Sequence, residues 1–145
     1  MKSIKFYTSK DPYFEFSNFY KHPIRINGVT FSSNEHYFQA MKCKENEDYI
    51  KVINSKNPGE AKSLGQNVAI REDWEDYKNH AMAKAVNAKF KDYKLRKILM
   101  DTGDAVLQGD EPDDYYWGIG KEGTGKNKLG IILMELRSRI RKELL

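Results

Sequence analysis

The sequence has a single cysteine, Cys43, and therefore cannot form an internal disulfide bond. A lone cysteine is typical of a protein in the reducing cytosol, and no Cys/His spacing of a metal site occurs. We expect a cytoplasmic protein that needs no metal ion and no bound cofactor. No apolar run is long enough to cross a bilayer and no signal peptide is recognisable, so we expect no membrane contact. Internal repeats and low-complexity linkers are also lacking, which predicts a single domain over residues 1–145.

The excess of positive charge is small. The net charge is +4, from 25 basic and 21 acidic residues, and most of these charges are interleaved along the chain. This balance argues only weakly for a nucleic-acid partner. The basic residues near the C-terminus lie where cations stabilise the end of a helix, which accounts for them without nucleic acid. The sequence does not indicate an oligomeric state.

Hydrophobic periodicity predicts a mainly helical α+β fold with a few short strands near the N-terminus. Asn27-Gly28 suits the tight turn of a β-hairpin, because both residues tolerate a positive φ. A polar run over residues 45–48 is expected to separate two helices. We expect strands at 3–7, 24–26, 29–31 and 105–107, and helices at 35–44, 49–54, 58–65, 72–93, around 95–99, and 127–144.

The stretch from Ser32 to Lys42 combines a helix start with an unusual polar face. Ser32 and Glu35 have the spacing of a capping box. In the helix that follows, Glu35, Gln39 and Lys42 fall on one stripe, with His36 beside it. An acid, an amide and an amine on one face are typical of a site. The alternative is that Glu35 only closes the capping box and that Lys42 is an ordinary surface lysine.

Two other segments combine polar groups with aromatic ones. Residues 13–20 place Asn18 among aromatic side chains, which either fill the core or line a pocket. Four acids between residues 110 and 114 precede Tyr115-Tyr116-Trp117. We expect three of them to face solvent and retain Asp114 as a candidate general acid, because an acid pressed against an aromatic ring holds its proton more tightly.

A glycine-rich loop precedes the last predicted helix. It contains four glycines in eight residues and ends at Asn127, where the helix begins. These are Gly118, Gly120, Gly123 and Gly125, followed by Asn127. Exposed N–H groups at a helix N-terminus favour phosphate. A P-loop is excluded, because Asn127 replaces the Ser or Thr that binds magnesium. The alternative is a flexible turn that binds nothing.

Several of these motifs occur together in one known family. The segments F-S-N-F, G-x-x-F-x-S-x-E-H-Y-F-Q-A-x-K and Y-W-G-x-G-x-x-G-x-G-x-N-x-L-G-x-x-L-M-x-L-R follow one another, with Trp74 between the last two. This order resembles the NADAR, or YbiA-like, family, and the likeness runs from Phe6 to Arg137.

The resemblance implies a mainly helical enzyme that cleaves an N-glycosidic bond, with no metal or cofactor. Its implied catalytic residues are Glu35, Lys42 and Asp114. Lys42 would form a Schiff base with C1 of an opened ribose, after losing its proton in a desolvated site. The implied substrate-binding residues are Trp74, Trp117 and the glycine loop, with Gly118, Gly120, Gly123, Gly125 and Asn127. The polar face of the helix and the aromatic segment add Asn18, His36 and Gln39 as substrate-binding candidates. The tryptophans would stack on the departing base, and the glycine loop would bind the ribose phosphate.

Three functions are compatible with this resemblance. The first is hydrolysis of phosphorylated ribosylamino-pyrimidine intermediates of riboflavin synthesis. The second is removal of ADP-ribose from guanine in DNA or RNA, which would make ADP-ribosylated nucleic acid a partner. The third is a non-catalytic module that binds NAD or ADP-ribose. The sequence does not decide between the first two substrates, whereas the presence of both Glu35 and Lys42 argues against the third function.

Overall fold

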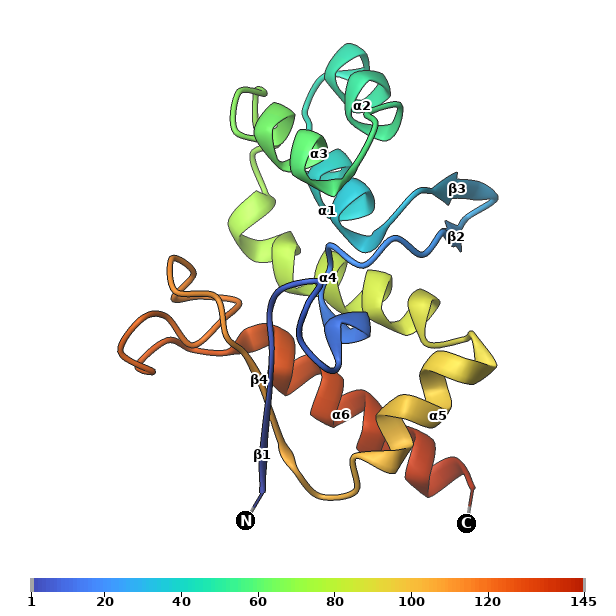
Figure 1. Ribbon diagram of the computed structural model, residues 1–145. Helices are drawn as coiled ribbons and strands as arrows, with labels where there is room; N and C mark the ends of the chain where they lie inside the picture. The colour runs from blue at the N-terminus through green and yellow to red at the C-terminus, as the bar shows by residue number, and fades with distance from the viewer. Residues whose placement is uncertain (1, 145) are drawn as a thin grey trace. The chain divides into compact units, whose positions relative to one another are not determined.

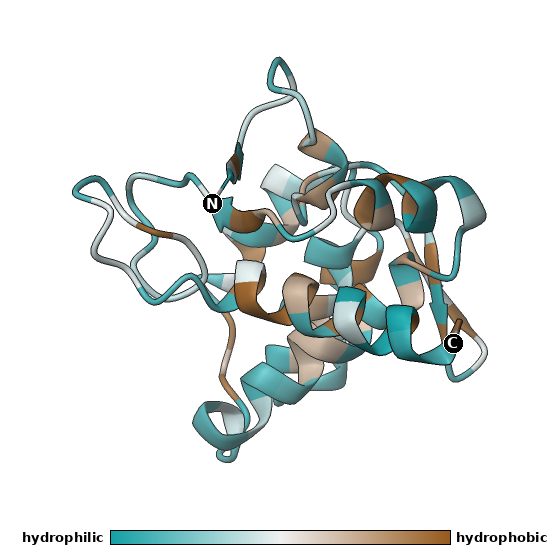
Figure 2. Ribbon diagram, turned by 90° about the horizontal axis from the view of Figure 1, so that it is seen from below, coloured by the Kyte–Doolittle hydropathy of each residue, from teal (hydrophilic) through white to brown (hydrophobic). Residues whose placement is uncertain are grey.

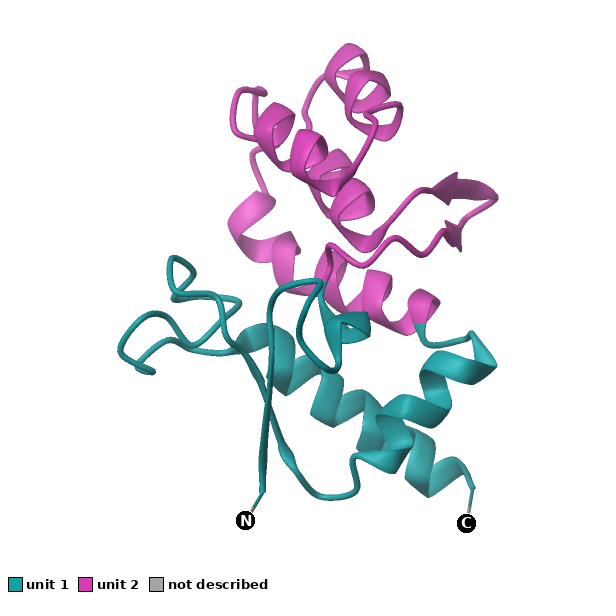
Figure 3. Ribbon diagram, in the orientation of Figure 1, with its two compact units in different colours: residues 1–17, 90–145 teal, residues 18–89 magenta. Residues whose placement is uncertain are grey.

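The computed structural model describes residues 2–144 and contains six α-helices and four short strands in that range (Figure 1). The mainly helical α+β class predicted from the sequence is confirmed. The chain divides into two compact units, residues 1–17 with 90–145 and residues 18–89 (Figure 3). Among residues 2–144, no helix is both long and apolar enough to cross a membrane.

The first unit is built around two strands that are far apart in the sequence. β1 (Ser3–Phe6) pairs in parallel with β4 (Val106–Gly109). The unit also contains the short 3-10 helix η1 (Phe14–Phe16), α5 (Tyr93–Asp101) and α6 (Lys128–Glu143). Both strands were predicted, but their pairing was not. Local patterns cannot reveal it, because the partners are about a hundred positions apart.

Helix α6 buries the apolar stripe that its sequence predicts. Leu129, Leu133, Leu136 and Ile140 are all buried. Brown and teal stretches alternate along the helices in Figure 2, as expected for helices with one buried side.

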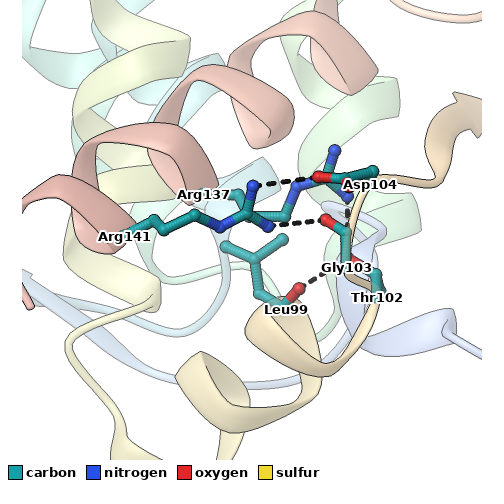
Figure 4. Close-up of polar contacts among 6 residues, drawn as sticks. All are labelled: Leu99, Thr102, Gly103, Asp104, Arg137 and Arg141. Carbon is teal, nitrogen blue, oxygen red and sulfur yellow. Dashed lines mark hydrogen bonds and ion pairs between the residues drawn. The ribbon is translucent and has the colours of Figure 1, made fainter.

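Two arginines of α6 attach this helix to the turn after α5 (Figure 4). Arg137 is buried, and its Nη1 donates a 2.8 Å hydrogen bond to Thr102 Oγ1. Arg141 donates to Asp104 Oδ1 at 3.0 Å and to the carbonyl of Gly103 at 2.8 Å. These contacts give two of the C-terminal basic residues a structural role within the unit.

The second unit is organised around α1 (Asn34–Lys42), whose residues from Asn34 to Ala40 are all buried. α1 packs against α2 (Asn46–Ile53), α3 (Pro58–Gly65) and α4 (Trp74–Lys89). An aromatic and polar helix is thus at the centre of this unit.

The hairpin of β2 (Ile24–Ile26) and β3 (Val29–Phe31) leads into α1. Its turn residues Asn27 and Gly28 have φ angles of 51° and 81°, as the sequence predicts.

Two helices, α2 and α4, have a boundary at least three residues from the predicted one. α2 begins at Asn46 and not at residue 49 as predicted, so most of the polar run at 45–48 lies within this helix. Its acids Glu47 and Asp48 occupy the first turn, where negative charge stabilises the helix dipole. α4 spans Trp74–Lys89 and is shorter than the predicted 72–93, because the chain turns before α5 begins at Tyr93.

Candidate functional site

The N-terminus of α1 is capped by Ser33, not by Ser32 as the sequence suggested. Ser33 Oγ accepts a hydrogen bond of 3.2 Å from the backbone N–H of His36. The third helical residue is therefore His36, and Glu35 is the second. The predicted capping box is wrong, because two consecutive serines make the position of the cap ambiguous by one residue. Closing such a box is thus not the role of Glu35.

Glu35 and Gln39 form a buried polar pair on α1. Each side chain belongs to a residue with only 6% of its surface exposed. Gln39 Nε2 donates a 2.7 Å hydrogen bond to Glu35 Oε2. A bond to a carboxylate is stronger than one between neutral groups, so it helps to offset the burial of the charge. The predicted polar stripe of acid and amide is thus present.

Lys42 is the last residue of α1 and is half-buried. Burial lowers the pKa of Lys42, while the negative charge of Glu35 raises it. Its backbone carbonyl accepts a 3.0 Å hydrogen bond from the N–H of Arg71. The position of Lys42 is therefore fixed at its backbone, and its amine is closer to the neutral form that a nucleophile requires.

Arg71 is a residue that the sequence analysis missed. Its Nη1 donates to the carbonyl of Met41 at 3.3 Å, and its guanidinium lies 4.0 Å from the centre of the Tyr77 ring. Arg71 also binds Asp73 through two hydrogen bonds. Nothing in its local sequence distinguishes it, because its partners on α1 are about thirty positions away.

His36 connects the start of α1 to the segment before α3. Its Nε2 lies 3.1 Å from the carbonyl oxygen of Ser55, and its Nδ1 lies 2.7 Å from Ser33 Oγ. A carbonyl can only accept, so Nε2 carries the hydrogen and Nδ1 accepts from the Ser33 hydroxyl. Burial lowers the pKa of His36, which favours this neutral form. Substrate binding by His36 stays a prediction.

Asn18 holds the other side of the same helix start. Its carbonyl accepts from the N–H of Glu35 at 3.2 Å, and its Nδ2 contacts Met82 Sδ at 3.2 Å. Asn34 Nδ2 donates to Asn18 Oδ1 at 3.4 Å. Asn18 thereby positions the backbone of Glu35, while its predicted contact with substrate stays untested.

Trp74 begins α4 and is 7% exposed. Its ring packs on Phe38 of α1 with a centroid separation of 5.0 Å. Trp74 therefore supports α1 within the second unit, and its predicted stacking on the substrate base stays a prediction.

The remaining predicted residues belong to the first unit and are described within it. Asp114 Oδ1 accepts hydrogen bonds from the N–H groups of Tyr116 at 3.0 Å and Trp117 at 2.8 Å. These bonds are those of a turn-stabilising aspartate. Trp117 is half-exposed, and its ring lies edge-on to Tyr116 at 4.8 Å. Proton transfer by Asp114 and base stacking by Trp117 stay predictions.

The N-terminus of α6 donates its backbone hydrogen bonds within the glycine loop. The N–H groups of Asn127, Lys128 and Leu129 donate to the carbonyls of Gly118 at 3.0 Å, Tyr116 at 3.0 Å and Trp117 at 3.1 Å, respectively. We expected these N–H groups to be available to a phosphate, whereas in the structure they donate to backbone carbonyls.

The side chain of Asn127 connects the glycine loop to β4. Its Nδ2 donates to the carbonyl of Leu107 at 2.9 Å, and its Oδ1 accepts from the N–H of Gly109 at 3.0 Å. The backbone of Asn127 has a φ of 53°, a left-handed conformation that asparagine tolerates. Asn127 therefore has a structural role in the first unit.

Two of the loop glycines are required by close backbone contacts. A Cβ atom at Gly118 would lie 2.9 Å from the carbonyl oxygen of Gly109, and one at Gly125 would lie 2.5 Å from that of Gly118. Gly120 and Gly123 have φ angles of 73° and 78°, which favour glycine. The glycines thus account for the folded shape of the loop, and phosphate binding by Gly118, Gly120, Gly123, Gly125 or Asn127 stays a prediction.

α1 thus carries a buried carboxylate and a partly desolvated lysine on one helix face, groups suited to acid–base and nucleophilic chemistry. Comparisons with known proteins identify the class of protein. The NADAR domain model matches residues 5–141. N-glycosidase YbiA of Shigella flexneri serotype 5b is 40% identical, over 94% of this chain and 88% of the relative.

Two further relatives extend this likeness. The riboflavin biosynthesis protein PYRR of Zea mays, a chloroplast protein, is 37% identical over 94% of this chain and 25% of its own length. The NMR structure of Escherichia coli YbiA matches with a TM-score of 0.90 and 39% identity, covering 98% of this chain and 86% of that one.

The chain belongs to the NADAR domain family, as its sequence motifs indicated. Its likeness to named N-glycosidases over almost its whole length identifies it as a hydrolase of that class.

Proposed function

We propose that this N-glycosidase cleaves the bond between ribose C1 and nitrogen in phosphorylated ribosylamino-pyrimidine intermediates of riboflavin synthesis. The observation that carries the proposal is the placement of Glu35 and Lys42 on one face of α1, where the charge of Glu35 acts on the amine of Lys42. Burial lowers the pKa of Lys42, and Glu35 is the first of the charged groups that act on this amine. The name of the maize relative, a riboflavin biosynthesis protein, supports the choice of substrate.

The proposed reaction begins with proton transfer from Lys42 to Glu35. The neutral Nζ attacks ribose C1 and forms a C–N bond, while the bond from C1 to the base nitrogen breaks. Glu35 returns the proton to this leaving nitrogen, so the base departs as a neutral amine. Electrons from Nζ then expel the ring oxygen O4′, which takes a proton from Nζ, and a Schiff base between Lys42 and C1 remains.

Water completes the proposed cycle. It adds to C1 of the Schiff base, and loss of Nζ releases the sugar phosphate as an aldehyde and restores Lys42. One water molecule is consumed for each glycosidic bond, as hydrolysis requires. Gln39 stabilises the charged form of Glu35 through its 2.7 Å hydrogen bond.

The test offers the protein two substrates and separates the products by chromatography. One is a ribosylamino-pyrimidine phosphate and the other is an oligonucleotide carrying ADP-ribose on guanine. We expect free amine and ribose phosphate from the first. Release of ADP-ribose from the second alone would assign the other substrate class, and no product from either would indicate a binding module.

A borohydride trap tests the covalent step. Borohydride reduces a Schiff base to a stable amine, so peptide mapping should place a sugar-phosphate mass on Lys42. Lys42→Arg keeps the charge but cannot lose its proton, and it should give neither product nor adduct. Lys44→Arg is the matched control, because Lys44 is an exposed lysine two positions away. An active Lys42→Arg protein, or an adduct only on another lysine, would exclude Lys42 as the nucleophile.

A further inference from the structure

The backbone of α3 comes close to α1 where Gly65 meets Gln39. A Cβ atom built on Gly65 would overlap the Gln39 side-chain oxygen Oε1 and would lie 2.6 Å from its Cδ and 3.2 Å from its Cβ. The carboxamide of Gln39 therefore occupies the place that any side chain at position 65 would take. Gly65 itself is buried.

Conformational freedom does not explain this glycine. Gly65 lies within α3 as its last helical residue and is not among the glycines with positive φ. Alanine has a higher helix propensity than glycine and would suit this backbone. The requirement for glycine at this position therefore comes from the space that Gln39 occupies.

The carboxamide of Gln39 lies between Gly65 and Glu35. Its Nε2 donates to Glu35 Oε2, and its Oε1 is buried with no hydrogen-bond partner among residues 2–144. If the amide were reversed, Oε1 would face the carboxylate of Glu35, and a contact between two hydrogen-bond acceptors is unfavourable. The charge of Glu35 thus fixes the orientation of the amide, and the missing side chain at Gly65 provides the space for it.

We propose that Gly65 is a positioning residue of the glycosidase, which acts through Gln39 on Glu35. The inference rests on the proposed role of Glu35 as the proton carrier. A side chain at position 65 would displace the flexible end of Gln39 and break its hydrogen bond to Glu35. The fold would remain intact apart from a small shift at Gln39 Cβ, because the atoms that overlap most, Oε1 and Cδ, are at the end of a flexible side chain. Proton transfer, in contrast, would lose its alignment.

The experiment compares Gly65→Ala with Gly59→Ala in the same helix. Gly59 is exposed, and a Cβ there meets only Asn57 Oδ1, at 3.3 Å. We expect Gly65→Ala to lower kcat about 100-fold, as a misplacement of about 1 Å can, with KM and melting temperature little changed. Gly59→Ala should retain the kcat of the unmodified protein. A lower melting temperature with unchanged kcat in Gly65→Ala would overturn the proposal.

A double variant tests the route through Gln39. Gln39→Ala should lower kcat as much as Gly65→Ala does, and adding Gly65→Ala to it should cause no further loss, because the overlap has gone. In both single variants the acid limb of the pH–rate profile should move to higher pH, since a carboxylate without its donor is protonated more readily. Independent, multiplying losses in the double variant would contradict the proposal.

A structural readout separates this inference from the proposed function. The side-chain NH₂ signals of Gln39 in ¹H–¹⁵N NMR spectra should shift in Gly65→Ala and stay in place in Gly59→Ala. If Glu35→Gln and Lys42→Arg are both fully active, the proposed function is wrong. The shift of the Gln39 NH₂ signals still reports the contact between position 65 and Gln39. If these two variants are inactive and Gly65→Ala retains both its signals and its kcat, the positioning role alone is wrong.

Discussion

Gln39 Nε2 donates a 2.7 Å hydrogen bond to Glu35 Oε2, one turn earlier on α1. Glu35 is therefore a buried carboxylate that accepts a hydrogen bond. It does not cap the helix, because the cap is Ser33. The Glu35→Gln variant retains a polar side chain of the same size but cannot carry a proton. We expect it to stay folded and to lose about 10²–10⁴-fold in kcat, the usual contribution of general acid–base catalysis. Thermal unfolding measures whether the variant stays folded, and steady-state kinetics measure its kcat. Turnover near that of the unmodified protein would remove Glu35 from the mechanism.

The pH dependence of adduct formation should report the pKa of Lys42. Burial lowers this pKa below the ordinary 10.5, and attack requires the neutral amine. The rate at which borohydride traps ribose 5-phosphate on the protein should therefore rise with pH and then level off, with the midpoint of the rise below pH 10.5. Glu35 raises the pKa of Lys42, so in Glu35→Gln the midpoint should move to lower pH. A midpoint that moves upward would contradict this assignment.

The two tryptophans should respond differently to substitution. Trp74 is 7% exposed and packs on Phe38, so Trp74→Ala should lower the free energy of unfolding by about 3–5 kcal/mol. Trp117 is half-exposed, and Trp117→Ala should instead weaken substrate binding by about 1–3 kcal/mol if the base stacks on it. Phe at either position should cost less than Ala. Calorimetric unfolding and substrate titration distinguish the two roles, and unchanged affinity in Trp117→Ala would exclude stacking there.

The position of the α1 cap can be tested with the two neighbouring serines. Ser33→Ala removes both the acceptor for His36 N–H and the donor to His36 Nδ1, and it should lower the free energy of unfolding by about 1–3 kcal/mol. Ser32 is exposed and is not the cap residue, so Ser32→Ala should leave stability unchanged. Urea unfolding measures both variants, and equal losses would show that the assigned cap is wrong.

Asn127 offers a test of structural against substrate-binding roles. Asn127→Ala removes the partners of Leu107 O and Gly109 N–H, and leaving such groups unpaired costs about 1–3 kcal/mol each. Asn127→Asp keeps the acceptor for Gly109 but places a second oxygen against the carbonyl of Leu107, and two acceptors disfavour that contact. We therefore expect the urea midpoint to fall in both variants. An unchanged midpoint together with weaker substrate binding would instead assign Asn127 to the substrate.

The sequence by itself determined the features that depend on neighbouring residues. The Asn27-Gly28 turn follows from the positive φ that both residues tolerate. The apolar stripe of α6 follows from helical periodicity, and the shared face of Glu35, Gln39 and Lys42 follows from the same rule. The family motifs added the identity of the enzyme class. All of these depend on spacings within a few turns of the chain.

Only the tertiary structure decided the features that depend on distant partners. The parallel pairing of β1 with β4 joins segments about a hundred residues apart. The lowered pKa of Lys42 results from burial, which no local pattern measures. Gly65 was expected only to end a helix, whereas its contact with Gln39 arises because α3 packs on α1. Distances between residues far apart in sequence, and the solvent that packing excludes, are set only when the chain has folded.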